Sequence, residues 1–352
     1  MRKNLFALGL ALFGMAIGFA GTTPVMAADS LTVTGAGATF PYPLYSKWFY
    51  EYSNSHPDVN FNYQSIGSGG GIRQITAGTV DFGATDAPMT DEEMAKLPGP
   101  ILHIPAAIGA VAVVYNLGGV GPGLRLTPDA LAAIFLGKIT KWNDPKIASD
   151  NAGAKLAGSD IVLVHRSDGS GTTDIFTNYL ATVSAEWKEK VGRGKSVRWP
   201  VGLGGKGNEG VAGAVKQTPG AIGYVELAYA TQNRMAMAAL RNREGNFVLP
   251  SLEATSEAAA GASKTMPADF RVSLVDAPGK DACPICGLTW ILLYKDQKDE
   301  AKGKALVTFL KWAMSDGQKR NAPLLYAPVP KTVVEKVDTA LKQIRYKGKS
   351  LY

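Results

Sequence analysis

The sequence predicts an α/β fold made of two domains. Segments with the pattern of strands alternate with segments with the pattern of helices along the chain. The chain has 352 residues, and about 325 remain once a predicted export signal (residues 1–27) is removed, which exceeds the usual size of a single hydrophobic core. No internal repeat or low-complexity tract interrupts this alternation.

The first elements are short and are separated by turns rich in glycine. In order they are a strand at 31–34, a glycine turn at 35–40, a helix that begins around Pro41 and ends near Tyr52, a strand at 59–63, a turn at 65–71 leading into 72–76, a strand at 80–83 and a turn at 84–88. Proline is favoured in the first turn of a helix, which is why Pro41 marks a helix start.

The middle and end of the chain continue the alternation. Residues 108–115 are apolar and rich in valine, as in a buried strand, and we expect them to form the first crossover between the domains. Thr127, with Pro128 next to it, caps a helix that carries Leu131 and Phe135. The later segments are a strand at 161–164, a helix at 174–180, an ambiguous stretch at 249–277, and a strand at 290–294 and a helix at 301–314 that return to the first domain.

The N-terminus has the features of a cleaved secretion signal. Arg2 and Lys3 precede an apolar run at 5–20, and residues 25–27 form a cleavage site with alanine at its last position. The alternative is a membrane anchor, but the run holds three glycines and is shorter than the roughly 20 residues of a span. Ala28 stands where a lipid-accepting cysteine would be, so we expect a soluble exported product.

The charge of the chain argues against nucleic-acid binding. Lys and Arg number 37 against 30 Asp and Glu, and residues 1–27 hold two basic residues and no acid, which leaves 35 against 30, or +5. The lysines are scattered, with no dense run and no aromatic interleaving. The charge supports only a weak long-range attraction for anions.

The most informative segment is the turn at 166–173, which follows a strand and leads into a helix. Its first residue is Arg166, whose fork of N–H groups suits a tetrahedral oxyanion, and Ser170, Gly171 and Thr172 open the helix. The N–H groups of a first helical turn are unpaired and the helix dipole is positive there. Similar turns occur at Thr39–Phe40 and at Ser68, so the sequence predicts a composite anion site. Each turn taken alone is equally well an ordinary capped turn.

Two acids determine which anion such a site would accept. If Asp86 faces the anion, repulsion is costly unless the ligand carries a proton to donate, as phosphate does at neutral pH and sulfate does not. Asp168 lies two residues from Arg166 and would hold its guanidinium in place. The alternative for both acids is a local role in capping a turn or helix.

Other chemistries fit less well. The G-x-G-x-x-G at 202–207 lacks a clean preceding strand and an ordinary helical run with an acid further on, so it does not complete a dinucleotide-binding pattern, although Lys206 could contact an anion. Ser170 lacks a nucleophile elbow, and no histidine clearly activates it, because His165 would point to the opposite face from Arg166. The three histidines have no metal-like spacing, so we expect no metal and no catalytic residue.

Cys283 and Cys286 are the only cysteines, in a C-x-x-C pair. A zinc site would need two more ligands, and a thioredoxin-like role would need a helix start where a strand is expected. We expect a local disulfide, which an oxidising compartment would permit.

Seven motifs occur in one order that is typical of a known family. They are TGAGATFP (34–41), IGSGGG (66–71), DFGATDAP (81–88), FLGKITKWND (135–144), RSDGSGT (166–172), WPVGLGGKGN (199–208) and GAIGYVE (220–226). Across essentially all of the mature chain, the sequence resembles the periplasmic phosphate-binding proteins of high-affinity phosphate ABC transporters.

The resemblance implies a two-lobed type II periplasmic-binding-protein fold, with a hinge and a ligand cleft between the lobes. The implied lobes are residues 28–106 and 282–352 for the first and 107–281 for the second. It also implies a periplasmic, monomeric protein that binds inorganic phosphate, needs no cofactor and delivers its ligand to an inner-membrane permease. The implied phosphate ligands are Thr39, Phe40, Ser68, Asp86, Arg166, Ser170, Gly171 and Thr172, with Asp168 orienting Arg166.

Two positions depart from the family pattern. Gly69 stands where a second serine is common, and the Cys283–Cys286 pair is unusual there.

Two other functions compete with the phosphate receptor: an exported phosphatase that uses Ser170, and a receptor for sulfate or molybdate.

Overall fold

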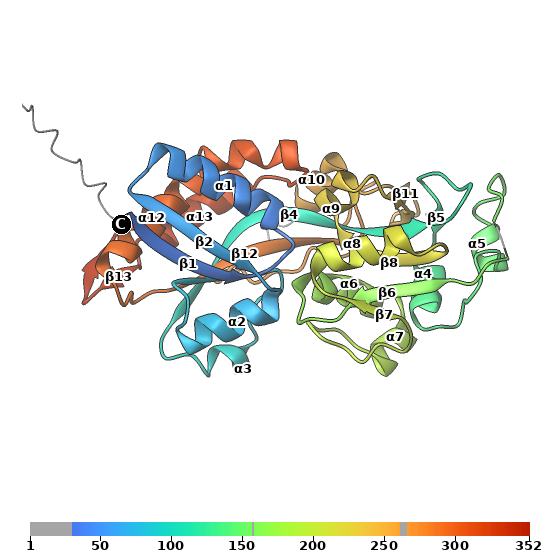
Figure 1. The fold of residues 1–352 in the computed structure, drawn as a ribbon, viewed down its shortest axis with the longest axis horizontal. Helices are drawn as coiled ribbons and strands as arrows, with labels where there is room; N and C mark the ends of the chain where they lie inside the picture. The colour runs from blue at the N-terminus through green and yellow to red at the C-terminus, as the bar shows by residue number, and fades with distance from the viewer. Residues whose placement is uncertain (1–29, 157, 261–265) are drawn as a thin grey trace, which may run out of the picture.

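The computed structural model describes residues 30–352 except residue 157 and residues 261–265. The molecule is elongated, with two α/β halves side by side along its long axis (Figure 1). The predicted signal peptide, residues 1–27, lies outside the described residues. Within those residues, none of the helices is long and apolar enough to cross a membrane.

One nine-stranded sheet runs through both halves. Its strands lie in the order β2-β1-β3-β12-β4-β8-β6-β7, and β9 pairs with β4. They are β1 (Leu31–Gly37), β2 (Val59–Ser65), β3 (Phe82–Thr85), β4 (Ile101–Asn116), β6 (Val162–Arg166), β7 (Leu203–Gly205), β8 (Ala221–Glu226), β9 (Ala236–Met237) and β12 (Cys286–Tyr294). The three strands β1, β2 and β3 are parallel to one another, as are β6, β7 and β8. We call the half with β1–β3 the first lobe and the half with β6–β8 the second lobe.

Two smaller sheets and the helices complete the described fold. The small sheets contain β5 (Arg125–Leu126), β10 (Ala239–Arg241) and β11 (Phe247–Val248), and β13 (Arg345–Tyr346) and β14 (Lys349–Ser350). The helices around the first lobe are α1 (Tyr42–Ser55), α2 (Ser68–Ala77), α3 (Asp91–Met94), α12 (Glu300–Ala313), η1 (Gly317–Arg320), η2 (Ala322–Leu324) and α13 (Lys331–Leu341). The others are α4 (Pro128–Phe135), α5 (Pro145–Ala148), α6 (Gly171–Val183), α7 (Ala185–Lys190), α8 (Gly207–Gln217), α9 (Leu227–Gln232) and α10 (Leu252–Ala260).

Strand β4 joins the two lobes. Its first part pairs with β12 as far as Ala110, and its second part pairs with β8 from Val111 onward. Residues 103–115 are all buried, as the valine-rich pattern predicts. The strand begins seven residues earlier than predicted, because Pro105 hides its start: the pairing with β12 shifts register between Thr289 and Trp290, where Pro105 lies. A proline has no N–H for a ladder, so it is accommodated at such a bulge.

Each lobe has its own aromatic core. In the first lobe, the ring of Phe61 stacks on Phe49 and lies 4.5 Å, centroid to centroid, from Phe309 of α12. In the second lobe, Phe176 of α6 stacks on Tyr224 of β8 with 4.2 Å between ring centroids. The second contact fixes α6 on the sheet, and α6 is the helix that begins with the glycine turn.

The segment at 202–207 differs from its prediction. A short strand, β7, lies inside it, and a helix, α8, begins at Gly207. The prediction that no helical run follows was wrong because the apolar face of α8 is made of small residues and only two valines, Val211 and Val215. Both valines are buried among five described buried side chains of β4, β6 and β8. Tertiary packing therefore supplies the stability that local propensity does not.

Replacing Gly35 with alanine should destabilise the first lobe. A Cβ there would lie 2.1 Å from the ring of Phe82, so we expect Gly35→Ala to lower the free energy of unfolding by about 2 kcal/mol. Gly213→Ala is the control, because Gly213 lies inside α8 with open space where a Cβ would stand. Alanine there should raise the free energy of unfolding by about 0.5 kcal/mol. Urea denaturation measures both, and equal effects at the two sites would contradict the packing described for β1.

Candidate functional site

The predicted site residues meet where the carboxyl ends of parallel strands from the two lobes face each other. In the first lobe, Thr39 follows β1, Ser68 follows β2 and Asp86 follows β3. In the second lobe, Arg166 ends β6 and the glycine turn that follows it opens α6. The ends of parallel strands are a common place for ligands in α/β proteins. All of these side chains are buried, with 3% exposure or less.

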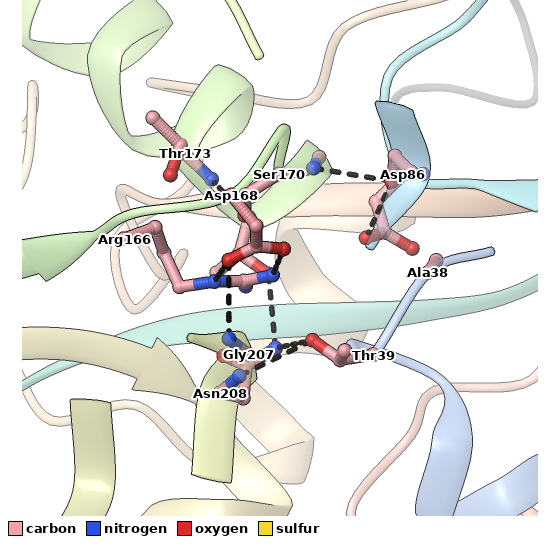
Figure 2. Close-up of polar contacts among 12 residues, drawn as sticks. Ala38, Thr39, Asp86, Arg166, Asp168, Ser170, Thr173, Gly207 and Asn208 are labelled. Carbon is pink, nitrogen blue, oxygen red and sulfur yellow. Dashed lines mark hydrogen bonds and ion pairs between the residues drawn. The ribbon is translucent and has the colours of Figure 1, made fainter. Parts of the chain in front are cut away.

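Arg166 is held flat against Asp168 (Figure 2). Its Nε donates to Oδ1 of Asp168 at 2.8 Å and its Nη2 donates to Oδ2 at 2.6 Å. Burial alone would raise the pKa of Asp168, but the hydrogen bonds and charge of Arg166 lower it below its usual range. Oδ1 also accepts from the N–H of Gly207 at 3.1 Å. The guanidinium is thus fixed on one edge, and Nη1, whose only described partner is Thr172 Oγ1 at 3.4 Å, is left to face the site.

Asp86 is a buried carboxyl with two hydroxyl donors. Thr289 Oγ1 donates to its Oδ1 at 2.8 Å, and Ser68 Oγ donates to its Oδ2 at 3.3 Å. Burial raises the pKa of Asp86 to about 7, although the bond from Thr289, the charge of Arg166 and the bond from Ser68 all act in the opposite direction. Near neutral pH this carboxyl therefore exists both as an acid and as a carboxylate.

Three hydroxyl groups around Arg166 have protons that no described residue accepts. Thr39 Oγ1 accepts from Asn208 Nδ2 at 2.7 Å, and Thr172 Oγ1 accepts from the same nitrogen at 3.1 Å. Ser170 Oγ accepts from the N–H of Thr173 at 3.0 Å. Since N–H groups occupy each oxygen as donors, each hydroxyl proton remains available for another acceptor.

Two backbone N–H groups complete the donor set. Within the described part of the chain, nothing accepts a hydrogen bond from the N–H of Phe40 or from that of Thr172, the second residue of α6. Buried donors without partners are costly. Together with Arg166, these donors and the single acceptor Asp86 form a site that suits an anion carrying one proton.

Glycines let the two lobes touch at this site. The N–H of Gly69 donates to the carbonyl of Gly169 at 2.9 Å, and the N–H of Gly171 donates to Ser68 Oγ at 3.1 Å. The N–H of Gly171, predicted as an anion ligand, is thus engaged by Ser68 in this structure. A Cβ on Gly69 would lie 3.2 Å from the Cα of Gly169, which is a tight fit for the serine that the family pattern has there. The two lobes are thus in direct contact in this structure.

Asn208 and Thr289 also contact the candidate site, although neither was predicted from the sequence. Asn208 lies in the first turn of α8, and its amide contacts Thr39 of the first lobe (Figure 2). The same amide also contacts Thr172 of the second lobe. A helical pattern after Gly207 was the signal that could have identified it. Thr289 comes from β12, far along the chain, and no local motif marks it. Lys206, a candidate anion contact in the sequence, is exposed.

A pocket of about 250 Å³ adjoins Asp86. Its lining includes Arg193, Arg271 and Asp174. Arg271 forms ion pairs with Asp91 and Asp269. Near this pocket, Lys195 of the second lobe lies 2.9 Å from Glu93 of α3, an ion pair that joins the lobes.

The two cysteines differ from their prediction. Cys283 and Cys286 are both buried free thiols, so the predicted disulfide is not formed in this structure. The two thiols contact each other, the sulfur of Cys283 also lies 3.9 Å from the carbonyl oxygen of Ile285, and Cys286 is the first residue of the extended strand β12. Across the residues that the structure describes, no three His, Cys, Asp or Glu side chains are grouped to hold a metal ion.

Comparisons with known proteins agree on one family. A model of the PBP superfamily domain matches residues 22–317. The phosphate-binding protein PstS of Xylella fastidiosa strain Temecula1 is 50% identical over 320 residues, which cover 90% of this chain and 87% of that protein. The same-named protein of Haemophilus influenzae is 46% identical over 323 residues, covering 92% and 95%.

Solved structures share the fold. A high-affinity periplasmic phosphate-binding protein, PfluDING, solved with bound phosphate, has a TM-score of 0.71 at 20% identity and covers 88% of this chain and 94% of its own. The phosphate-binding protein of Stenotrophomonas maltophilia has a TM-score of 0.68 at 21% identity with the same coverage. The chain belongs to the PBP superfamily and, within it, to the family of PstS phosphate-binding proteins.

Proposed function

We propose that this protein is a receptor that captures inorganic phosphate between its lobes and delivers it to the permease of an ABC transporter. The observation that carries the proposal is the buried donor set: three hydroxyl protons, two N–H groups and Arg166 converge around one acceptor, Asp86. Neutral donors can hold a dehydrated anion without many opposing charges. The names of the relatives, phosphate-binding protein PstS, agree with this ligand.

Asp86 selects between anions according to whether the anion carries a proton. Phosphate at neutral pH carries a hydrogen that the carboxylate of Asp86 can accept. Sulfate carries none, so it would face a buried like charge. The raised pKa of Asp86 also means that removing its charge costs little in the free receptor.

Ligand would stabilise the closed arrangement because each lobe supplies only part of the donor set. We propose that residues 28–106 and 282–352 form the first lobe and residues 107–281 the second, with the hinge where β4 passes from β12 to β8. Residues 1–27 would direct export to the periplasm, where the protein acts as a monomer. The permease would recognise the closed form.

We also propose that the protein has no enzymatic activity. Ser170 caps α6 through Thr173, and the ring of His165 stacks on Trp199, 4.7 Å away, with Nδ1 on the carbonyl of Arg166. Among the described residues, no histidine and no carboxylate forms a hydrogen bond with Ser170 Oγ. A phosphatase would need such a base.

Calorimetry on protein freed of ligand by unfolding and dialysis tests the function directly. We expect one phosphate to bind per chain with high affinity and sulfate to bind far more weakly at pH about 8, where Asp86, with a pKa of about 7, is mostly charged. Ser170→Ala should weaken phosphate binding, and neither protein should turn over p-nitrophenyl phosphate. Turnover that disappears in Ser170→Ala would establish the phosphatase instead, and equal binding of both anions would remove Asp86 from the site.

Sulfate binding should depend on pH through Asp86. Between pH about 8 and about 5.5, a carboxyl with a pKa of about 7 passes from mostly charged to mostly neutral, so we expect sulfate affinity to rise roughly tenfold as the pH falls. Asp86→Asn should bind sulfate at both pH values without this dependence. Asp58→Asn, an exposed position, is the control and should keep it. A wild-type sulfate affinity that does not change with pH would count against the role of Asp86.

Gly171→Ala should block closure. A Cβ at Gly171 would lie 2.5 Å from Ser68 Oγ and 2.6 Å from the Cβ of Asp86, both in the other lobe. We expect phosphate affinity to fall by about a hundredfold or more, and small-angle scattering to show no compaction on adding phosphate. Gly213→Ala serves as the matched glycine control, with affinity and compaction unchanged. Normal compaction in Gly171→Ala would show that the lobes do not meet at this residue.

A further inference from the structure

Glu226 is a buried carboxyl that the proposed binding of phosphate does not use. It ends β8, is fully buried and caps α9. Its Oε2 accepts from the N–H of Ala228 at 2.8 Å and lies 3.0 Å from the hydroxyl of Tyr326. Its Oε1 has no hydrogen-bond partner among the described residues. The titratable groups that face it are Tyr326, Tyr229 and Asp86, and none of them is a cation.

The hydroxyl of Tyr326 has more acceptors than protons. It lies 2.6 Å from the carbonyl oxygen of Phe40 and 3.0 Å from Oε2 of Glu226. A phenol carries one hydrogen, and a carbonyl oxygen can only accept. If the phenol proton lies in the shorter contact, to Phe40, then the contact with Glu226 needs a second proton, which only the carboxyl can supply.

We infer that Glu226 is a neutral carboxylic acid that donates a hydrogen bond to the hydroxyl of Tyr326, which in turn donates to the carbonyl of Phe40. This series of hydrogen bonds positions Phe40 at the anion site. The inference deepens the proposed function, because it names a positioning residue for the phosphate site. Burial raises the pKa of Glu226 well above its usual value, and the charge of Asp86 adds to this effect.

Tyrosine hydroxyls hold two successive carbonyls in this way. Tyr229 donates to the carbonyl of Thr39 at 2.7 Å, while Tyr326 donates to that of Phe40. The carbonyl of Thr39 and the N–H of Phe40 belong to one planar peptide group, so fixing the first aims the second toward the site. The neutral state of Glu226 matters because a second buried carboxylate near Asp86 would repel the same anion.

Infrared spectroscopy tests the protonation state without phosphate. At pH ~8.5, where Asp86 is mostly ionised, we expect the ligand-free protein to show the carbonyl band of a protonated carboxylic acid. Glu226→Gln should lose that band, while Asp86→Asn and the exposed control Glu300→Gln keep it. Absence of the band in the wild-type protein would overturn the inference, and this arm does not depend on whether phosphate is the ligand.

Calorimetry tests the positioning role. Tyr326→Phe should weaken phosphate binding about tenfold, while Tyr50→Phe, at a position 66% exposed, leaves it unchanged. Glu226→Leu should weaken binding similarly, and Glu226→Gln, which keeps a neutral donor for Tyr326, should restore it to within about threefold of wild type.

Two outcomes would overturn this part. If Glu226→Gln binds phosphate more tightly than wild type, Glu226 is a charged group that repels the ligand. If Tyr326→Phe binds phosphate as wild type does, the hydrogen bonds from Glu226 through Tyr326 do not position Phe40. The Tyr326→Phe variant also tests the positioning role on its own if Glu226→Leu does not fold. Failure of the wild-type protein itself to bind phosphate would instead reject the proposed function and leave the infrared result standing.

Discussion

The need to satisfy buried hydrogen-bond donors is the constraint on which the rest of the structure depends. The N–H groups of Phe40 and Thr172 and the protons of three hydroxyls are buried without acceptors among the described residues. Leaving such groups unpaired costs free energy, so a ligand that accepts from them would stabilise this arrangement. The donors come from turns after parallel strands in both lobes. The position of each strand end, and thus the order of the sheet, determines whether the set can converge.

The contact between the two lobes and the connection between them are built from different elements. At the site the lobes touch through glycine backbone, with Gly69 against Gly169 and Gly171 against the hydroxyl of Ser68, and side chains such as Lys195 with Glu93 join the lobes beside it. The connection between them is a pair of long strands, β4 and β12, that run antiparallel through the middle of the sheet. Glycines leave room for the lobes to approach at this contact, while the strands keep the two carboxyl edges facing each other.

Local patterns predicted much of the site, and long-range pairing explains what they missed. The turns with Thr39, Ser68 and Ser170 stand out because strand, glycine turn and helix start occur within a few residues. Thr289 reaches Asp86 from β12, about 200 residues away along the chain, and only the order of the strands brings them together. Asn208 was missed for a different reason, since the glycine-rich α8 is stabilised by packing rather than by propensity. The family resemblance supplied the ligand, which donors alone would have left open between several oxyanions.

The pairing of Arg166 with Asp168 has a consequence for the surroundings in which the protein can work. The guanidinium and the carboxylate cancel each other at short range, so the site attracts its ligand through dipoles and hydrogen bonds rather than through a net positive field. Dissolved salt screens fields between distant charges over about 10 Å and has little effect on contacts inside a dry cavity. For the receptor that we propose, capture would then be largely independent of ionic strength, and the same site would serve in dilute and in saline surroundings.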